Sequence, residues 1–61
     1  MVDVGQIYCL THNDTSLEHF VVFDVDELPA STARATIFSF EKNETHNVHA
    51  RTLQRVCERV A

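Results

Sequence analysis

Glycine and proline are almost missing from this 61-residue chain, which has only Gly5 and Pro29. Loops that cradle phosphate groups need several glycines, because only glycine lets the backbone come close to the anion without strain. Neither G-x-x-x-x-G-K-[ST] nor G-x-G-x-x-G occurs. The sequence therefore argues against nucleotide-dependent chemistry.

Cysteine and long apolar runs are also scarce. Cys9 and Cys57 are too few for the disulfide framework of a small secreted domain. No run of apolar side chains exceeds four residues, as in FVVF, residues 20–23, whereas a membrane helix needs about 20 such residues. The opening MVDVGQ has an acid where a signal peptide has basic residues. We predict a cytoplasmic protein with reduced thiols and no membrane contact.

Basic residues are few: five lysines and arginines stand against nine aspartates and glutamates, a net charge of −4. A surface that binds nucleic acid needs many contacts to phosphate, so this class of partner is disfavoured. The exception is the repeat of Arg51, Arg55 and Arg59 at every fourth position. If this segment is one helix, the three arginines form a stripe on one side. Weak nucleic-acid binding through that stripe is one alternative function.

Motifs for catalysis are absent as well. The chain has no G-x-S-x-G and no H-E-x-x-H, and a domain of this size leaves little room for a concave substrate pocket. We therefore predict that the protein is not an enzyme and needs no cofactor.

Enough apolar residues are present to fold one domain over residues 1–61, since they make up 44% of the chain and include four phenylalanines. Residues 4–11, VGQIYCLT, are rich in β-formers, and the polar HNDTS that follows predicts a hairpin turn. LEHFVVFDV then alternates between two faces. Leu17, His19, Val21, Phe23 and Val25 form one face; Glu18, Phe20, Val22 and Asp24 form the other.

The middle of the chain has two interpretations. DELPAS should end the second strand, because Pro29 cannot donate to a sheet. In ARATIFSFE, residues 33–41, the β-branched and aromatic residues predict a third strand. A helix over residues 26–40 is the alternative, because alanine and arginine favour helix.

A C-terminal helix is predicted from Val48 to the end of the chain. KNETHN, residues 42–47, supplies the preceding turn, and a polar residue within it serves as the N-cap (Asn43, Thr45 or Asn47). One side of the helix is largely apolar: His49, Leu53, Val56, Cys57 and Val60. The predicted fold is α+β: a three-stranded antiparallel sheet with this helix on one face, in the order β-β-β-α. The alternative fold is β-β-α-α.

Histidine and cysteine raise the alternative of a zinc-stabilised domain. Cys9, His12, His46 and His49 are the candidate ligands, and zinc prefers four such groups in a tetrahedron. Their spacing is poor, because residues three apart in a strand, such as Cys9 and His12, point to opposite faces. The leading prediction is therefore that no metal binds.

More large apolar side chains are present than one face of a small sheet can hide. If the helix covers Val21 and Phe23, then Phe20 and Val22 point outward; if it covers the other face, Val21 and Phe23 do. An apolar surface left in this way usually marks an interface. The predicted interface residues are Tyr8, Phe20, Val22, Phe38 and Phe40. We expect a small acidic protein-protein interaction module, such as an inhibitor, adaptor or antitoxin-like regulator, whose partner is another protein, a second copy in a homodimer, or both.

Overall fold

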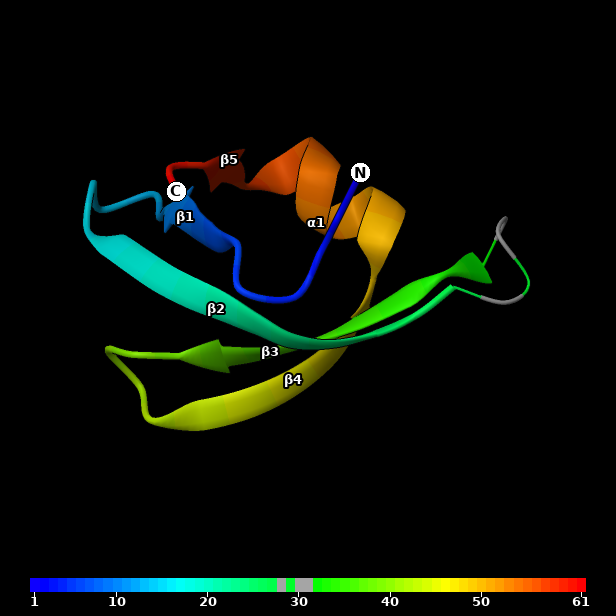
Figure 1. The fold of residues 1–61 in the computed structure, drawn as a ribbon. Coiled ribbons are helices and arrows are strands. Elements are labelled where there is room, and N and C mark those ends of the chain that lie inside the picture. Colours follow the sequence, from blue (N-terminus) through cyan, green and yellow to red (C-terminus); the bar gives the residue numbers. More distant parts are fainter. Residues whose placement is uncertain (28, 30–31) are drawn as a thin grey trace.

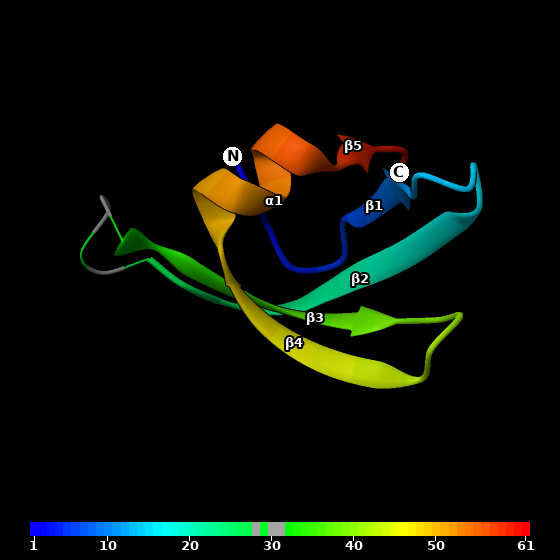
Figure 2. The same cartoon turned by 180° about the vertical axis from the view of Figure 1, so that it is seen from behind.

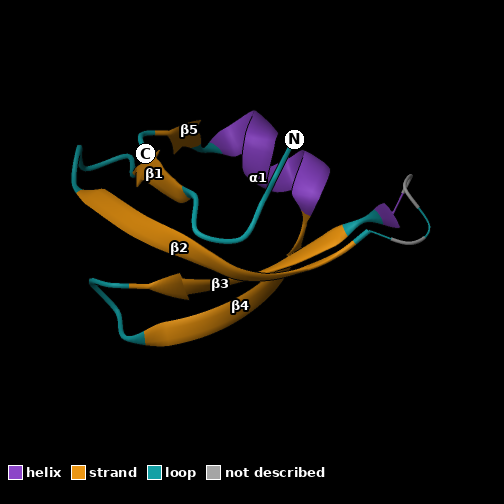
Figure 3. Cartoon of the chain, viewed as in Figure 1, coloured by secondary structure: helices purple, strands orange, loops and turns teal. Residues whose placement is uncertain are grey.

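The described residues form five strands and one short α-helix. The structure is a computed structural model that describes residues 1–27, 29 and 32–61. Residues 28, 30 and 31 of the predicted break after the second strand lie outside the described residues. The described elements are β1 (Ile7–Thr11), β2 (Leu17–Asp26), β3 (Arg34–Ser39), β4 (Glu44–His49), α1 (Ala50–Val56) and β5 (Glu58–Arg59) (Figure 1, Figure 3).

The strands form one antiparallel sheet in the order β4-β3-β2-β1-β5. The first four strands are a meander, whereas β5 returns from the end of the chain to lie beside β1. Figures 1 and 2 show that β2, β3 and β4 are bowed, with α1, β1 and β5 gathered on the concave side. Helix α1 thus leads from one edge strand of the sheet, β4, to the other, β5.

A bulge interrupts the regular alternation of β2. The register of β2 against β3 shifts between Val22 and Asp24, which leaves Phe23 as an extra residue. Such a bulge increases the local bend and twist of a strand. Beyond it the inward-facing residue is Val25, which lies opposite the buried Ala35.

The turn between β1 and β2 depends on Asp14. Its Oδ1 accepts hydrogen bonds from the backbone N–H of Ser16 at 3.0 Å and from the Ser16 hydroxyl at 2.6 Å. Thr15 has a positive φ of 67°, and the backbone N–H of His12 donates to the carbonyl of Ser16 at 2.9 Å. The hairpin turn predicted from HNDTS is confirmed.

Helix α1 covers the concave face of the sheet but is only seven residues long. His49 precedes it without a side-chain cap. Leu53 points inward and is 2% exposed, whereas Val56 is 51% exposed. The backbone N–H of Cys57 donates to the carbonyl of Leu53 at 3.0 Å, and the chain then becomes extended.

The core lies between α1 and the face of the sheet that we call the inner face. It consists of apolar side chains that are at most 6% exposed: Val2, Tyr8, Phe20, Val22, Ala35, Ile37 and Leu53. Of the two arrangements considered from the sequence, the helix covers the Phe20 and Val22 face. Phe23, in the bulge, is 51% exposed.

The predicted three-stranded β-β-β-α fold is wrong, because the sheet contains two further strands. Residues 44–49, for which the sequence predicts a turn and the start of a helix, form β4, which also excludes Asn43, Thr45 and Asn47 as caps of the helix. Residues 58–59 were assigned to the helix but pair with β1. The alternative β-β-α-α fold is also wrong, since Arg34–Ser39 is a strand.

Candidate binding surface

The face of the sheet that points away from α1, which we call the outer face, has no other element over it among the described residues. Alternation along the strands assigns its members. On β1 and β2 they are Ile7, Cys9, Thr11, Leu17, His19, Val21, Asp24 and Asp26. On the other strands they are Arg34, Thr36, Phe38, Thr45, Asn47, His49 and Glu58.

An apolar row crosses this outer face at right angles to the strands. Ile7 lies opposite Val21, and Val21 lies opposite Phe38, so side chains from β1, β2 and β3 line up. Val60 extends the row beyond β1, because its backbone N–H donates to the carbonyl of Ile7 at 2.9 Å. The row therefore spans most of the width of the sheet.

Two exposed aromatic side chains lie near this row: Phe40 follows the end of β3, and Phe23 lies in the bulge of β2, beside the middle of β3. Phe40 is 53% exposed and meets the edge of Phe38, with ring centroids 5.8 Å apart and an interplanar angle of 87°. The bulge in β2 presents Phe23 to solvent. Exposed aromatic side chains are typical anchors of protein interfaces because they bury a large area at little entropic cost.

Carboxylates border the apolar row. Asp24, Asp26 and Glu58 are exposed on the outer face, and the basic side chain of Arg34 lies opposite Asp26. On the side near Phe40, His19 Nδ1 contacts Glu41 Oε2 at 2.5 Å. The border of the outer face is therefore predominantly acidic.

The predicted interface residues fall into two groups. Tyr8, Phe20 and Val22 belong to the core, where they are at most 6% exposed, so their assignment to a surface is corrected. They face inward because α1 lies over them. Phe38 is partly buried and Phe40 is exposed, and both lie on the side of the sheet that α1 leaves open.

A polar cluster that the sequence analysis missed lies at one end of the inner face. Glu18 is only 4% exposed. Its Oε2 accepts a hydrogen bond from the Ser39 hydroxyl at 2.5 Å, while its Oε1 lies 2.8 Å from His12 Nε2 and 3.5 Å from Lys42 Nζ. Ser39 is fully buried, and its hydroxyl also accepts from the backbone N–H of Lys42 at 3.2 Å. The burial of Glu18 could have been predicted, because Glu18 is two residues before the buried Phe20 in a strand and therefore lies on the same face.

These contacts hold the carboxylate of Glu18 in its charged form. The hydrogen bond from Ser39 lowers the pKa of Glu18, and this effect, helped by His12 and Lys42, outweighs the opposing effect of burial. The hydroxyl of Ser39 donates directly to the carboxylate, and His12 contacts the carboxylate and not the hydroxyl. The cluster is suited to joining β2 to β3 and the two hairpin turns.

A small cavity of about 280 Å³ lies beside this cluster. Its walls are mainly apolar and include Phe20, Leu53 and Cys57. Burial raises the pKa of the Cys57 thiol, and the nearness of Cys9 and Glu18 acts in the same direction. Cys57 is therefore less reactive than an ordinary thiol.

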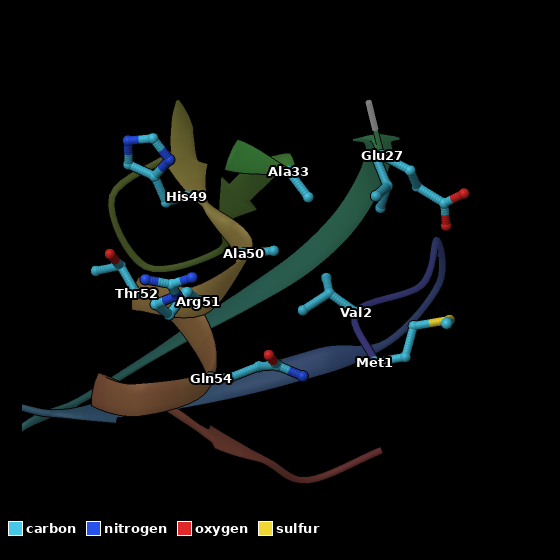
Figure 4. Close-up of a pocket in the computed structure, with 10 residues that line it drawn as sticks. Met1, Val2, Glu27, Ala33, His49, Ala50, Arg51, Thr52 and Gln54 are labelled. Atoms are coloured by element: carbon cyan, nitrogen blue, oxygen red, sulfur yellow. The ribbon is translucent and has the colours of Figure 1, made fainter. Parts of the chain in front are cut away.

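A larger hollow, of about 810 Å³, lies at the other end of α1. Figure 4 shows Val2 and Ala50 lining it, whereas Glu27, His49 and Arg51 are spread around its margin. Because these polar groups do not converge on one point, the hollow lacks the arrangement that would orient a polar ligand.

The candidate zinc ligands are dispersed. Cys9 lies on the outer face, His12 contacts Glu18, and His46 Nε2 lies 3.2 Å from Glu44 Oε2 and packs edge-on against the ring of Phe20. His49 is exposed. In the described part of the chain no three histidine, cysteine or acidic side chains are grouped as metal ligands.

The predicted arginine stripe is also divided. Arg51 and Arg55 are exposed on α1, but the helix ends at Val56 and Arg59 belongs to β5. Arg59 lies opposite Tyr8, and its Nε donates to the carbonyl of Ala61 at 3.1 Å. The three arginines do not lie on one helix face.

Comparison with models of protein families, with curated proteins and with solved structures finds no match to this chain. Within residues 1–27, 29 and 32–61, no helix has the length and apolar character needed to cross a bilayer.

Proposed function

We propose that this chain is a small acidic interaction module that binds a partner protein through the outer face of its sheet and performs no catalysis. The observation that carries this proposal is the apolar row of Ile7, Val21 and Phe38, extended by the exposed Phe23 and Phe40. Contiguous apolar surface of this kind, bordered by charged side chains, is typical of protein interfaces.

The charge of the outer face favours a partner different from the chain itself. Two copies packed outer face to outer face would bring the carboxylates of Asp24, Asp26 and Glu58 into one interface, where like charges repel. A partner with an apolar patch bordered by lysine and arginine complements this face. An inhibitor, an adaptor or an antitoxin-like regulator acts in this way, by occupying a surface of another protein.

The compartment we propose is the cytoplasm. Cys9 and Cys57 are unpaired, and they point to opposite sides of the β1–β5 pair, since Cys9 lies opposite Glu58, the neighbour of Cys57. Free thiols persist most readily in a reducing environment.

Cross-linking from within the native host tests the proposed surface. A photoreactive phenylalanine analogue at position 40 should cross-link a discrete protein, whereas the same analogue at position 56, which is similarly exposed but lies on α1, should not. With the cross-linked protein purified, Phe23→Ser should weaken binding at least about tenfold, the loss of one aromatic anchor. Equal cross-linking at both positions, or unchanged affinity of Phe23→Ser, would contradict the proposal.

A further inference from the structure

Strand β4 is an edge of the sheet whose outer side is open. It pairs only with β3 among the described strands. The backbone N–H of Ala50 donates to the carbonyl of Ala33 at 2.8 Å, which fixes the phase of the alternating bonds between the two strands. Glu44, His46 and Val48 then bond inward to β3, and the backbone groups of Thr45, Asn47 and His49 point outward.

Most protection against strand pairing is missing from this edge. Natural edge strands are blocked by proline, charged side chains (lysine above all), a bulge, very short length or a covering element, and of these β4 has only the charge of Glu44 at its first position. Strand β4 has the sequence ETHNVH, pairs with β3 without a bulge, and is exposed at every position except Val48. Figure 2 shows α1 joined to β4 only at its end, with the rest of the strand uncovered.

We infer that β4 is a self-association site, at which a second copy of this chain adds its own β4 antiparallel to the first. A two-fold axis through Asn47, perpendicular to the sheet, places Asn47 opposite the second copy's Asn47 and Thr45 opposite the second copy's His49. These are the residues whose backbone groups point outward, so each of these pairs exchanges main-chain hydrogen bonds. Two sheets thereby become one continuous sheet.

The charges on β4 do not oppose this register. Glu44 lies opposite Ala50 of the second copy, and the two copies of Glu44 are at opposite ends of the junction. His46 lies opposite Val48 of the second copy, so like charges do not meet directly across the strands. The acidic border of the outer face, which opposes face-to-face packing, lies away from this junction on β2 and β5.

The orientation of the two copies follows from the axis. Rotation about an axis perpendicular to the sheet keeps the outer faces on the same side, so the apolar rows of both copies face the same direction. The pairing of β4 does not depend on the proposed binding of a partner to those rows.

Sedimentation velocity between about 10 and 500 µM tests the inference, because association depends on protomer concentration. The full chain should change from monomer to dimer over this range. Asn47→Pro should remain monomeric, because proline removes an outward N–H that is not needed within the fold. Asn47→Ala is the matched control, since it keeps this N–H, and should dimerise like the parent.

Asn47→Lys adds a second test that does not alter the backbone. The substitution lies on an exposed position, but the two-fold axis brings the two lysines together, so dimerisation should weaken by up to about fivefold. Circular dichroism of each variant establishes that it is folded.

Three results would overturn the inference: a monomeric parent chain over the whole range, a folded Asn47→Pro that dimerises like the parent, or an undiminished Asn47→Lys dimer. The outer-face variant Phe23→Ser should still dimerise. Loss of the dimer in that variant would place self-association on the outer face and would also contradict the inference, whereas failure of the cross-linking experiment above would leave it intact.

Discussion

The side chain of Glu18 shows how this small core contains a charge. A buried carboxylate is costly unless hydrogen bonds and opposite charges replace its lost water. Ser39, His12 and Lys42 supply these groups from three different segments of the chain. Alternation in β2 places Glu18 on the same face as Phe20. The groups that contact its carboxylate come from other segments of the chain, so the sequence alone does not reveal that the carboxylate has hydrogen-bond partners.

Replacement of Glu18 should change both stability and its dependence on pH. The folded-state pKa is below the ordinary value of 4.5, so the stabilisation is fully present above that value and is lost as pH falls through the folded pKa. Glu18→Gln should lower the free energy of unfolding by about 1 to 3 kcal/mol at neutral pH and flatten its decline in acid. Urea denaturation at pH 7 and at acidic pH measures both effects.

Glu27→Gln is the matched control for loss of one negative charge, because Glu27 is exposed. Its unfolding free energy should stay within about 0.5 kcal/mol of the parent. If the free energy of unfolding of Glu18→Gln falls as steeply in acid as that of the parent, Glu18 is not the group that causes the loss of stability in acid.

At the scale of elements, the sequence predicts the strands that have a regular pattern and misses those that do not. The alternation of residues 17–25 and the β-formers of residues 34–39 correctly predict β2 and β3. Strand β4 has only Val48 as a partly buried apolar residue. An exposed edge strand of this kind has no period to detect, because its partner β3 determines its conformation.

The C-terminal segment shows a different limit. The apolar positions from His49 to Val60 have a helical spacing, yet the helix ends at Val56. Residues 58–59 are extended because they pair with β1, which is almost the whole chain away in sequence. The helix propensity of a segment does not predict pairing with a strand so far away in the sequence. The same pairing places Arg59 in β5, apart from Arg51 and Arg55 on the helix.

Two substitutions in α1 should differ in their effect. Leu53→Ala should lower the free energy of unfolding by about 2 to 4 kcal/mol, because it leaves a cavity in the core. Val56→Ala, at a half-exposed position on the same helix, should cost less than about 1 kcal/mol. Thermal and urea denaturation measure both changes, and equal losses would mean that Leu53 does not anchor the helix.

At the scale of the whole molecule, β5 completes the sheet. Its pairing with β1 covers one side of Tyr8, a core residue, and uses main-chain hydrogen bonds between Ile7, Val60 and Ala61. In a chain of 61 residues, only about 60% of the surface is buried on folding. The few bonds of β5 are therefore a substantial part of the stability.

Val60→Pro tests this contribution. It removes the N–H that donates to Ile7 and should lower the free energy of unfolding by about 1 to 3 kcal/mol. Val60→Ala retains that donor at an exposed position, and should stay within about 0.5 kcal/mol of the parent. Similar urea midpoints for the two variants would argue that the pairing of β5 contributes little.

The antiparallel pairing of β1 with β5 also determines how this chain resists mechanical force. The backbone N–H of Ile7 donates to the carbonyl of Ala61 at 3.1 Å, so the first strand begins where the last one ends. A load applied to Ile7 and Ala61 pulls the two strands apart sideways, along their hydrogen bonds. The hydrogen bonds between β1 and β5 then break one after another instead of all together. Strand β5 is therefore the first to separate from the sheet.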